Sequence, residues 1–282
     1  MILIAESGST KCDWVILQSS NKQITRVRTK GLNPAILKKK ALQKIIVSNP
    51  LLHKNKEQIN TIYFFGAGCN TTKNNQKIKT VLSNFFTNAT SIIEEDMMAA
   101  VYASVNEPAI VSILGTGSNC CYYNNNTIVK KTPSLGFMVM DEGSGNYFGK
   151  ELLKSYYYKK MPEELSFSLG NKFNLKEEKV IKKLYQSKTP NKYLASFAPF
   201  IFENQEHLFI KEIIKKGIQK FVENQILQFS KELETKPLHF VGSIAYHSRE
   251  YITKELAKHG LKPSGFVRRP IDNLITHILK IN

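Results

Sequence analysis

The chain has 282 residues, of which 42% are hydrophobic and 10% aromatic, and its formal net charge is +17. This length suits one large or two medium domains, and the composition is that of an ordinary globular enzyme. No apolar run is long enough to form a membrane-spanning helix. The opening segment lacks a basic leader, and we therefore expect a cytoplasmic protein.

The strong positive charge raises the question of a nucleic-acid partner. The lysines are scattered through segments with a helical pattern, where a solvated face is expected. Arginine, which recognises bases better than lysine does, is rare. We therefore expect no nucleic-acid partner, and because no run could span a bilayer we also expect no membrane partner. The charge should still attract anionic substrates such as nucleotides.

Cysteine usage indicates reduced thiols. The chain has four cysteines, Cys12, Cys69, Cys120 and Cys121. No C-x-x-C pair occurs, so the sequence predicts neither a zinc site nor a redox pair. We expect all four to be reduced and mostly buried.

The chain opens with two apolar runs, Leu3–Ala5 and Trp14–Leu17, around a polar turn. Small residues in that turn let backbone N–H groups approach phosphate oxygens, Ser9 and Thr10 add hydroxyl donors, and Lys11 adds positive charge. A nearby acid can hold Mg²⁺ through water. A plain polar hairpin turn explains the same residues, so both readings stay open here.

Strands and helices alternate over the next ninety residues, which is typical of α/β proteins. Asn33 before Pro34 has the pattern of a helix N-cap, and Leu37, Ala41 and Ile45–Ile46 would form that helix's apolar face. The further predicted elements are a strand Thr25–Lys30, a strand Thr61–Phe65 that leaves through a glycine loop, a helix Lys73–Phe86, a strand Ala89–Ile93 and a helix Asp96–Ser104.

A second copy of the opening pattern begins near Pro108. Ala109–Leu114 is a buried strand, Gly115–Asn119 is a turn of small residues, and a hairpin follows across Asn124–Asn126. Two such turns could face each other across a cleft, one from each half of the protein.

The remainder is mostly helical. A glycine-rich segment from Met140 opens a helix that runs to about Lys160, and such a helix start carries free N–H groups. Residues 162–235 are predicted to be mostly helical, with a long amphipathic helix from about Gln205 to Leu233. A strand from Leu238 ends in a turn at Gly242, a helix follows from Tyr246, and a last helix spans Ile271–Leu279.

With these segments in order, the chain resembles the N-acetylglucosamine kinases and the BadF/BadG/BcrA/BcrD ATPases, within the superfamily of acetate and sugar kinases, Hsp70 and actin. The resemblance covers almost the whole length. It is carried by the segments Glu6–Trp14, Gly31–Pro34, Glu95–Ala100, Leu114–Cys120, Asp141–Gly145 and Phe240–Ala245.

The resemblance implies an α/β fold of two ribonuclease-H-like domains, as in actin-like ATPases, with a cleft between them that holds ATP and Mg²⁺. The implied domains are residues 1–107, residues 108–269 with a helical insertion, and a C-terminal helix, residues 270–282, that packs back on the first domain. Family members are often dimers.

The resemblance further implies an ATP-dependent kinase that phosphorylates the 6-hydroxyl of an amino sugar, with N-acetylglucosamine as the leading candidate. Asp96 would be the catalytic base and also a sugar ligand, although the bare sequence favours a helix N-cap there. Glu6, where the family usually has aspartate, would hold the metal through water. The implied nucleotide contacts are Ser9, Thr10, Lys11, Thr116 and Gly242. The other implied sugar contacts are Asn33, Ser118, Asn119, Ser134, Leu135, Gly136 and Asp141.

Three alternatives remain at this stage. The acceptor could be N-acetylmuramic acid or glucosamine, because a few pocket side chains decide between such sugars. The chain could instead be an ATPase that activates a radical dehydratase. Such relatives carry an iron–sulfur cluster between subunits, and the positions of the cysteines in this chain argue against such a cluster. It could also be a non-catalytic sugar sensor, with Glu6 as the sign of lost activity.

Overall fold

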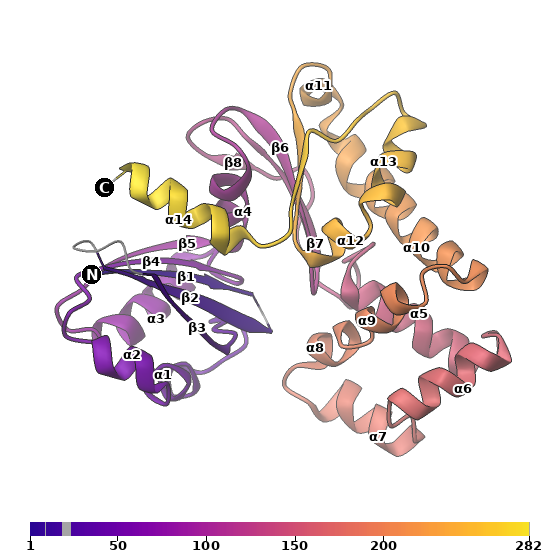
Figure 1. Cartoon of the computed structure of the whole chain (residues 1–282), viewed down its shortest axis with the longest axis horizontal. Helices are drawn as coiled ribbons and strands as arrows, with labels where there is room; N and C mark the ends of the chain where they lie inside the picture. Colours follow the sequence, from indigo (N-terminus) through magenta and orange to yellow (C-terminus); the bar gives the residue numbers. More distant parts are fainter. Residues whose placement is uncertain (9, 19–23, 282) are drawn as a thin grey trace. The chain divides into compact units, whose positions relative to one another are not determined.

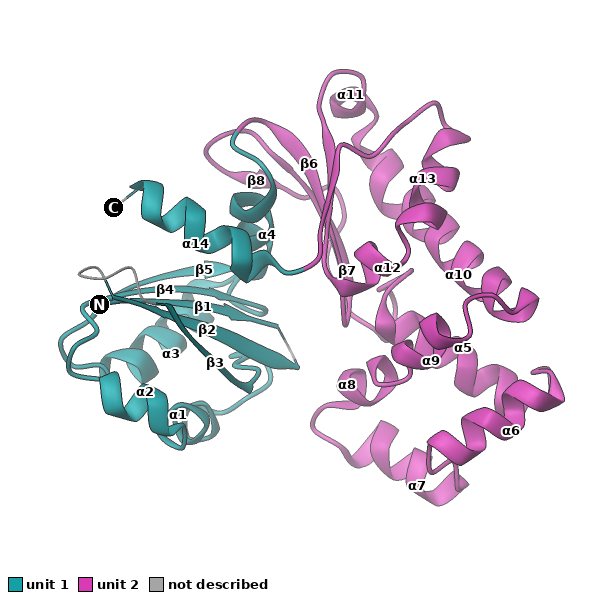
Figure 2. Ribbon diagram, viewed as in Figure 1, with its two compact units in different colours: residues 1–106, 269–282 teal, residues 107–268 magenta. Residues whose placement is uncertain are grey.

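A computed structural model describes residues 1–8, 10–18 and 24–281 (Figure 1). The chain forms two compact units: unit 1 comprises residues 1–106 and 269–282, and unit 2 comprises residues 107–268 (Figure 2). Over the described ranges, no helix is long and apolar enough to cross a membrane. Each unit is built on one five-stranded sheet, which confirms the predicted α/β class.

The sheet of unit 1 has the strand order β3-β2-β1-β4-β5. β2 runs antiparallel to both neighbours, whereas β1, β4 and β5 are parallel. The strands are β1 (Ile2–Ser7), β2 (Lys11–Leu17), β3 (Ile24–Lys30), β4 (Thr61–Gly66) and β5 (Thr90–Glu95).

Helices cover both faces of this sheet, which is why its central strand β1 is a nearly continuous apolar run (Figure 1). One face packs on α1 (Lys39–Val47), α2 (Pro50–Asn55) and α3 (Thr72–Ser83). The other face packs on α4 (Asp96–Ser104) and α14 (Pro270–Ile281), which also contact each other. Leu3 and Ala5 belong to the core under α1–α3, so by alternation Ile4 and Glu6 point toward α4 and α14.

Unit 2 repeats the same topology in the order β10-β9-β6-β7-β8, which confirms the second copy expected from the sequence. Its strands are β6 (Ala109–Leu114), β7 (Ser118–Tyr123), β8 (Ile128–Val129), β9 (Leu238–Val241) and β10 (Gly265–Val267). Its helices are α5 (Gly145–Tyr157), α6 (Glu163–Lys172), α7 (Glu177–Ile181), α8 (Pro190–Ala195), α9 (Ala198–Glu203), α10 (Leu208–Phe221), α11 (Ser230–Leu233), α12 (Ser243–His247) and α13 (Arg249–Ala257).

The helix predicted to start at Asn33 begins later, at Lys39. The Asn33 side chain accepts a hydrogen bond from the Ala35 N–H, and its carbonyl accepts one from the Leu37 N–H, so Asn33 closes a turn. Leu42 and Ile46 are buried and Leu37 and Ile45 pack partly buried against the core, but Ala41, predicted on the apolar face, is exposed.

Other boundaries also differ from the predictions. Ser118 and Asn119 belong to β7 and not to the preceding turn, and α12 begins directly after Gly242. The long helix expected from Gln205 is interrupted after α10 by a π-type turn over Val222–Ile226 and a 3₁₀ turn over Leu227–Phe229. All four cysteines are free and buried, as expected.

Candidate active site

Several predicted site residues of unit 1 lie at one edge of its sheet. Because β1, β4 and β5 are parallel neighbours, their carboxyl ends meet at the same edge. Ser7 is in register with Gly66, and Gly66 is in register with Glu95. The chain therefore leaves all three strands side by side, which brings Glu6 and Asp96 to one edge of the sheet.

Asp96 is the first residue of α4 and not its N-cap. The N-cap position belongs to Glu95, which has an extended backbone and makes no capping hydrogen bond through its side chain. The capping interpretation of Asp96 is therefore wrong. The Asp96 carboxylate is half-buried, and its charge adds to the rise in the pKa values of Glu6 and Cys69, so these three side chains are close enough to interact.

Glu6 has an unusually high pKa. Burial, first, and then the charges of Asp13 and Asp96 raise its pKa to about 7, although Lys11 and Arg269 oppose the rise. Such a pair of nearby carboxylates fits a divalent cation held through water, because Mg²⁺ typically keeps several waters and takes one or two carboxylates. The described part of the chain contains no cluster of three or more His, Cys, Asp or Glu side chains that could hold a metal ion.

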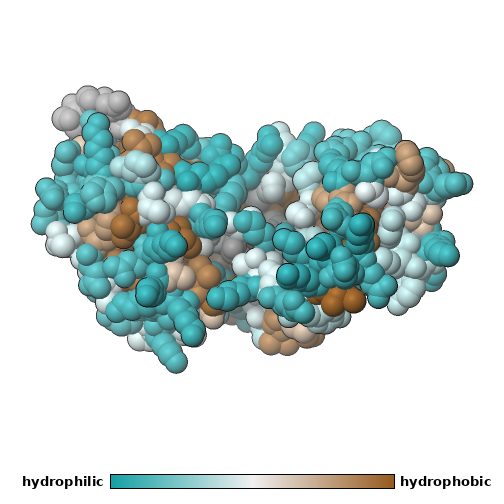
Figure 3. Space-filling model, turned by 90° about the horizontal axis from the view of Figure 1, so that it is seen from below, coloured by the Kyte–Doolittle hydropathy of each residue, from teal (hydrophilic) through white to brown (hydrophobic). Residues whose placement is uncertain are grey.

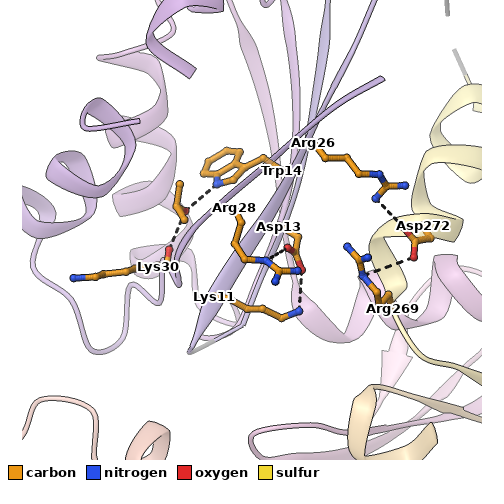
Figure 4. Close-up of polar contacts among 9 residues, drawn as sticks. Lys11, Asp13, Trp14, Arg26, Arg28, Lys30, Arg269 and Asp272 are labelled. Carbon is orange, nitrogen blue, oxygen red and sulfur yellow. Dashed lines mark hydrogen bonds and ion pairs between the residues drawn. The ribbon is translucent and has the colours of Figure 1, made fainter. Parts of the chain in front are cut away.

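Asp13 forms the centre of an ion-pair network (Figure 4). Its buried carboxylate accepts hydrogen bonds from Arg28 Nε at 2.6 Å and from Lys11 Nζ at 3.0 Å. Burial disfavours the charge, but these two cations outweigh it and lower the pKa of Asp13.

A second ion-pair group lies beside the first (Figure 4). Asp272, in the first turn of α14, pairs with Arg26 at 2.7 Å and with Arg269 Nε at 3.8 Å.

Of the predicted nucleotide residues in this unit, Thr10 accepts a hydrogen bond from the Gly31 N–H through its carbonyl. Ser9 lies outside the described residues.

Asn33 is held at the same sheet edge as Asp96. The Leu32 N–H donates to Ser7 Oγ at 2.8 Å, which ties this segment to the end of β1. Gly68 has a φ of +82°, and a Cβ there would lie 2.3 Å from Asn33 Oδ1, so only glycine admits the Asn33 side chain. The structure thus gathers Glu6, Asn33 and Asp96 at this edge.

In unit 2, several predicted site residues lie on or beside the loop after β6. The N–H groups of Gly145 and Asn146 donate to the carbonyls of Gly115 and Thr116 at 2.9 and 3.0 Å. The first N–H groups of α5 are therefore used to hold the loop, contrary to the free helix start that the sequence suggested. Gly242 has a φ of +115°, and a Cβ there would lie 2.3 Å from the Leu114 carbonyl oxygen.

Asp141 holds the end of the Gly115–Ser118 loop through a hydrogen bond. It is buried, with a φ of +71°, and it accepts hydrogen bonds from the Ser118 N–H at 3.2 Å and from Asn146 Nδ2 at 2.9 Å. Burial raises the pKa of Asp141, and these two donors oppose the rise. It does not cap α5, because Ser144 does so by accepting from the Tyr147 N–H.

Asn146 was not identified from the sequence. It is 1% exposed, and its Oδ1 is buried with no hydrogen-bond partner in the described structure. Its only sequence signal was its place two residues after the helix N-cap. It joins the loop carbonyl of Thr116 to the carboxylate of Asp141, so it holds two predicted site residues in one arrangement.

The remaining predicted residues differ in their settings. Asn119 Oδ1 accepts a hydrogen bond from the Cys120 N–H, and Ser118 Oγ donates to the Glu142 carbonyl at 2.8 Å. Ser134 and Leu135 lie on an exposed loop that leads into Asp141. Gly136, with a φ of +77°, accepts hydrogen bonds from Val139 and Met140 through its carbonyl.

A cavity of about 510 Å³ opens beside the Gly115–Ser118 loop. Gly115, Thr116 and Gly145 form one wall, and Ser243 and His247 of α12 form another. Ala198, Pro199 and Phe202 of α9 contribute an apolar wall, and the rings of Phe202 and His247 lie 5.2 Å apart. A cavity of this size with an apolar wall and a few polar groups is typical of a small-molecule site.

Comparisons with known proteins agree with this fold. Residues 6–269 match the model of the BadF/BadG/BcrA/BcrD ATPase family. A candidate N-acetylglucosamine kinase from Porphyromonas gingivalis is 30% identical, with a TM-score of 0.90 and 98% of each chain covered.

Two more distant structures are similar in fold alone. A candidate N-acetylglucosamine kinase from Chromobacterium violaceum is 11% identical, with a TM-score of 0.71 and 98% of each chain covered. A ROK family glucokinase from Streptomyces griseus, solved with glucose and AMPPNP, is 10% identical, with a TM-score of 0.55 and 95% of this chain and 94% of that one covered. A comparison with curated proteins gave no match.

Proposed function

The chain belongs to the BadF/BadG/BcrA/BcrD ATPase family, and we propose that it is an ATP-dependent kinase for the 6-hydroxyl of an amino sugar, with N-acetylglucosamine as the leading acceptor. The observation that carries the proposal is the cavity of unit 2, which joins the Gly115–Thr116 loop to an apolar wall. A nucleotide needs both features, because its base is apolar and its phosphates need donors. The 30% identical neighbour with the name of such a kinase supports the choice of acceptor.

For the nucleotide, we assign Thr116 and Gly242 in unit 2 and Ser9, Thr10 and Lys11 in unit 1. A Cβ at Gly242 would meet the end of β6, so the close approach of that turn to the loop depends on glycine. The hydroxyl of Thr116 and the ammonium of Lys11 would be donors to phosphate oxygens. Lys11 would leave Asp13 to do so, and Arg28 would then keep Asp13 paired.

For the acceptor, we assign Asn33 and Asp96 in unit 1 and Ser118, Asn119, Ser134–Gly136 and Asp141 in unit 2. Asp96 would be the base. Its carboxylate would take the proton of the sugar 6-hydroxyl while that oxygen bonds to the γ-phosphorus of ATP and the bond to ADP breaks. The proton would thus stay on Asp96 and the phosphoryl group would pass to the sugar.

Glu6 and Asp96 would hold a Mg²⁺ ion through water, and that ion would neutralise charge on the phosphates. The positive charge of Lys11 and Arg269 near Glu6 would add to the same effect. Glutamate in place of the usual aspartate extends the carboxylate by one methylene, which a bridging water would accommodate.

A coupled ADP-release assay over a panel of sugars tests the proposal. We expect sugar-dependent ADP release, greatest with N-acetylglucosamine, and we expect Asp96→Asn to abolish it without weakening sugar binding. Glu95→Gln, which changes the adjacent acid, is the matched control and should stay active. Release without any sugar would identify an activator ATPase, and sugar binding without release would identify a sensor. The burial of all four cysteines already argues against a cluster shared between subunits.

A further inference from the structure

One face of unit 1 is strongly basic, although its lysines look scattered in the sequence. Residues 31–93 contain nine lysines and one acidic residue, Glu57. The fold gathers these lysines because α1, α2 and α3 pack side by side on one face of the sheet. Seven of them are exposed and define what we call the basic face: Lys38, Lys39, Lys40, Lys44, Lys54, Lys73 and Lys79.

Several lysines elsewhere in the chain have an acidic partner, but those of the basic face differ. Within unit 2, some helix lysines pair with nearby acids, as Lys154 does with Glu151 at 3.0 Å and Lys211 with Glu206 at 3.0 Å. None of the seven lysines of the basic face has an ion pair among the described residues. Residues 31–93 have nine lysines and one acid, whereas residues 107–268 have 22 lysines and 16 acids, so positive charge is locally denser over α1–α3 than in unit 2.

Aliphatic side chains protrude between these lysines. Ile36, Val47 and Leu51 are 46%, 42% and 43% exposed, and they come from the segment before α1, the end of α1 and the start of α2. Figure 3 shows the molecule from the side on which α1 and α2 lie in Figure 1, with brown apolar atoms set among teal hydrophilic ones. The basic face therefore combines dense positive charge with small apolar contacts.

We propose that the basic face docks reversibly on a membrane surface rich in anionic lipid. Lysine clusters gain free energy near such a surface, and aliphatic side chains can enter the headgroup boundary beside them. Nucleic acid fits less well, because residues 31–93 contain no arginine, and no Phe, Tyr or Trp of this segment is among the exposed large hydrophobic residues. The expectation of no membrane partner rested on the lack of a membrane-spanning run, and reversible docking at the membrane surface needs no such run.

Flotation with lipid vesicles tests this proposal. We expect the protein to bind vesicles of phosphatidylcholine with 30% phosphatidylglycerol and not vesicles of phosphatidylcholine alone, and we expect about 0.3 M salt to release it. The variant K38Q/K39Q/K40Q/K44Q should bind at least tenfold more weakly. A control with K154Q/K179Q/K211Q/K215Q has the same change in net charge but alters paired lysines of unit 2, and it should bind nearly as the wild type does.

The apolar part is tested with Leu51→Ser, which should weaken vesicle binding at least twofold while duplex DNA binding stays unchanged. The proposal is overturned by equal loss in both quadruple variants, by equal binding to neutral vesicles, by no binding to anionic vesicles, or by tighter binding to a short DNA duplex than to the vesicles. Thermal melting of each variant, compared with the wild type, verifies that it is folded. None of these readouts depends on kinase activity, so failure here leaves the proposed function untouched.

Discussion

The raised pKa of Glu6 predicts that replacing this residue with glutamine stabilises unit 1 at neutral and alkaline pH. Burial under α4 and α14 penalises the ionised carboxylate, and the charges of Asp13 and Asp96 add to the penalty. Glutamine keeps the size of the side chain and removes the charge. The variant therefore removes a cost that the wild type bears whenever Glu6 is ionised.

The sign and the size of the effect follow from proton linkage. The folded pKa of about 7 lies above the ordinary value of 4.5, so the folded state binds more protons than the unfolded state between these values. The free energy of unfolding of the wild type should therefore fall as pH rises from 4.5 to 7. The difference corresponds to at most about 3 kcal/mol, and the partial exposure of the Glu6 side chain makes the effect smaller.

Trp14 makes the measurement specific to unit 1. It is the only tryptophan of the chain, it is 1% exposed, and it packs on Phe64 in the core of unit 1. Urea unfolding followed by its fluorescence, in EDTA to remove metal, should show Glu6→Gln equal to the wild type at pH 4 and more stable at pH 8. Glu57→Gln, at an exposed site of the same unit, is the control and should show no such trend. A constant difference between Glu6→Gln and wild type at both pH values would refute the reasoning.

Three further predictions concern the braces of the site. Gly242→Ala should destabilise unit 2 by about 3 kcal/mol, seen by calorimetry, because its φ of +115° and the Leu114 carbonyl both exclude a Cβ; a melting temperature equal to that of the wild type would contradict this. Asn146→Ala should raise KM for the sugar at least tenfold and leave KM for ATP nearly unchanged, because the buried Asp141 loses a donor; equal rises in both constants would show a general loss of structure. Arg28→Gln should lower the stability of unit 1 at pH 7 by only about 1 kcal/mol, since Arg28 is largely exposed. The variant should also lose less stability on acidification than the wild type does. The reason is that the lowered pKa of Asp13 stabilises the fold above the ordinary pKa of aspartate and not below it. Trp14 fluorescence between pH 3 and 7 measures both effects, and identical acid curves for the variant and wild type would contradict the assignment to Asp13.

The sequence predicted those parts of the fold that depend on local pattern. Strands β1, β4 and β6 are apolar runs bounded by small residues; β4 and β6 were predicted to within one residue at each end, and β1 to within two. The helix over Asp96–Ser104 was predicted with its observed bounds. The repeated order of strand, polar turn and strand was visible because each copy has its own glycine and hydroxyl residues at the turn.

The parts that failed depend on contacts distant in sequence. Asn33 has the features of a cap, but its side chain is packed against Gly68, and only the fold shows that the N-cap lies five residues later, at Lys38. β10 has three residues, too few to show a period, and it exists because β9 offers a parallel edge. Asn146 has no distinct local pattern, since its importance comes from Thr116 and Asp141, which lie on other segments.

The duplicated topology also explains where the chemistry differs between the two units. The fifth strand of each sheet, β5 or β10, is followed by a charged residue, which is Asp96 in unit 1 and Arg268 in unit 2. Arg268 lies over the Tyr246 ring of its own unit, whereas Asp96 interacts electrostatically with Glu6.

The helices that follow these two strands, α4 and α14, both pack in unit 1, on the face that bears Glu6. Unit 1 therefore has one more helix on that face than a simple repeat would supply. That extra cover adds to the desolvation of Glu6, and Arg269 at the start of α14 offsets part of the cost. The unusual pKa of Glu6 is thus a consequence of how the repeat ends, which no residue near Glu6 in the sequence could reveal.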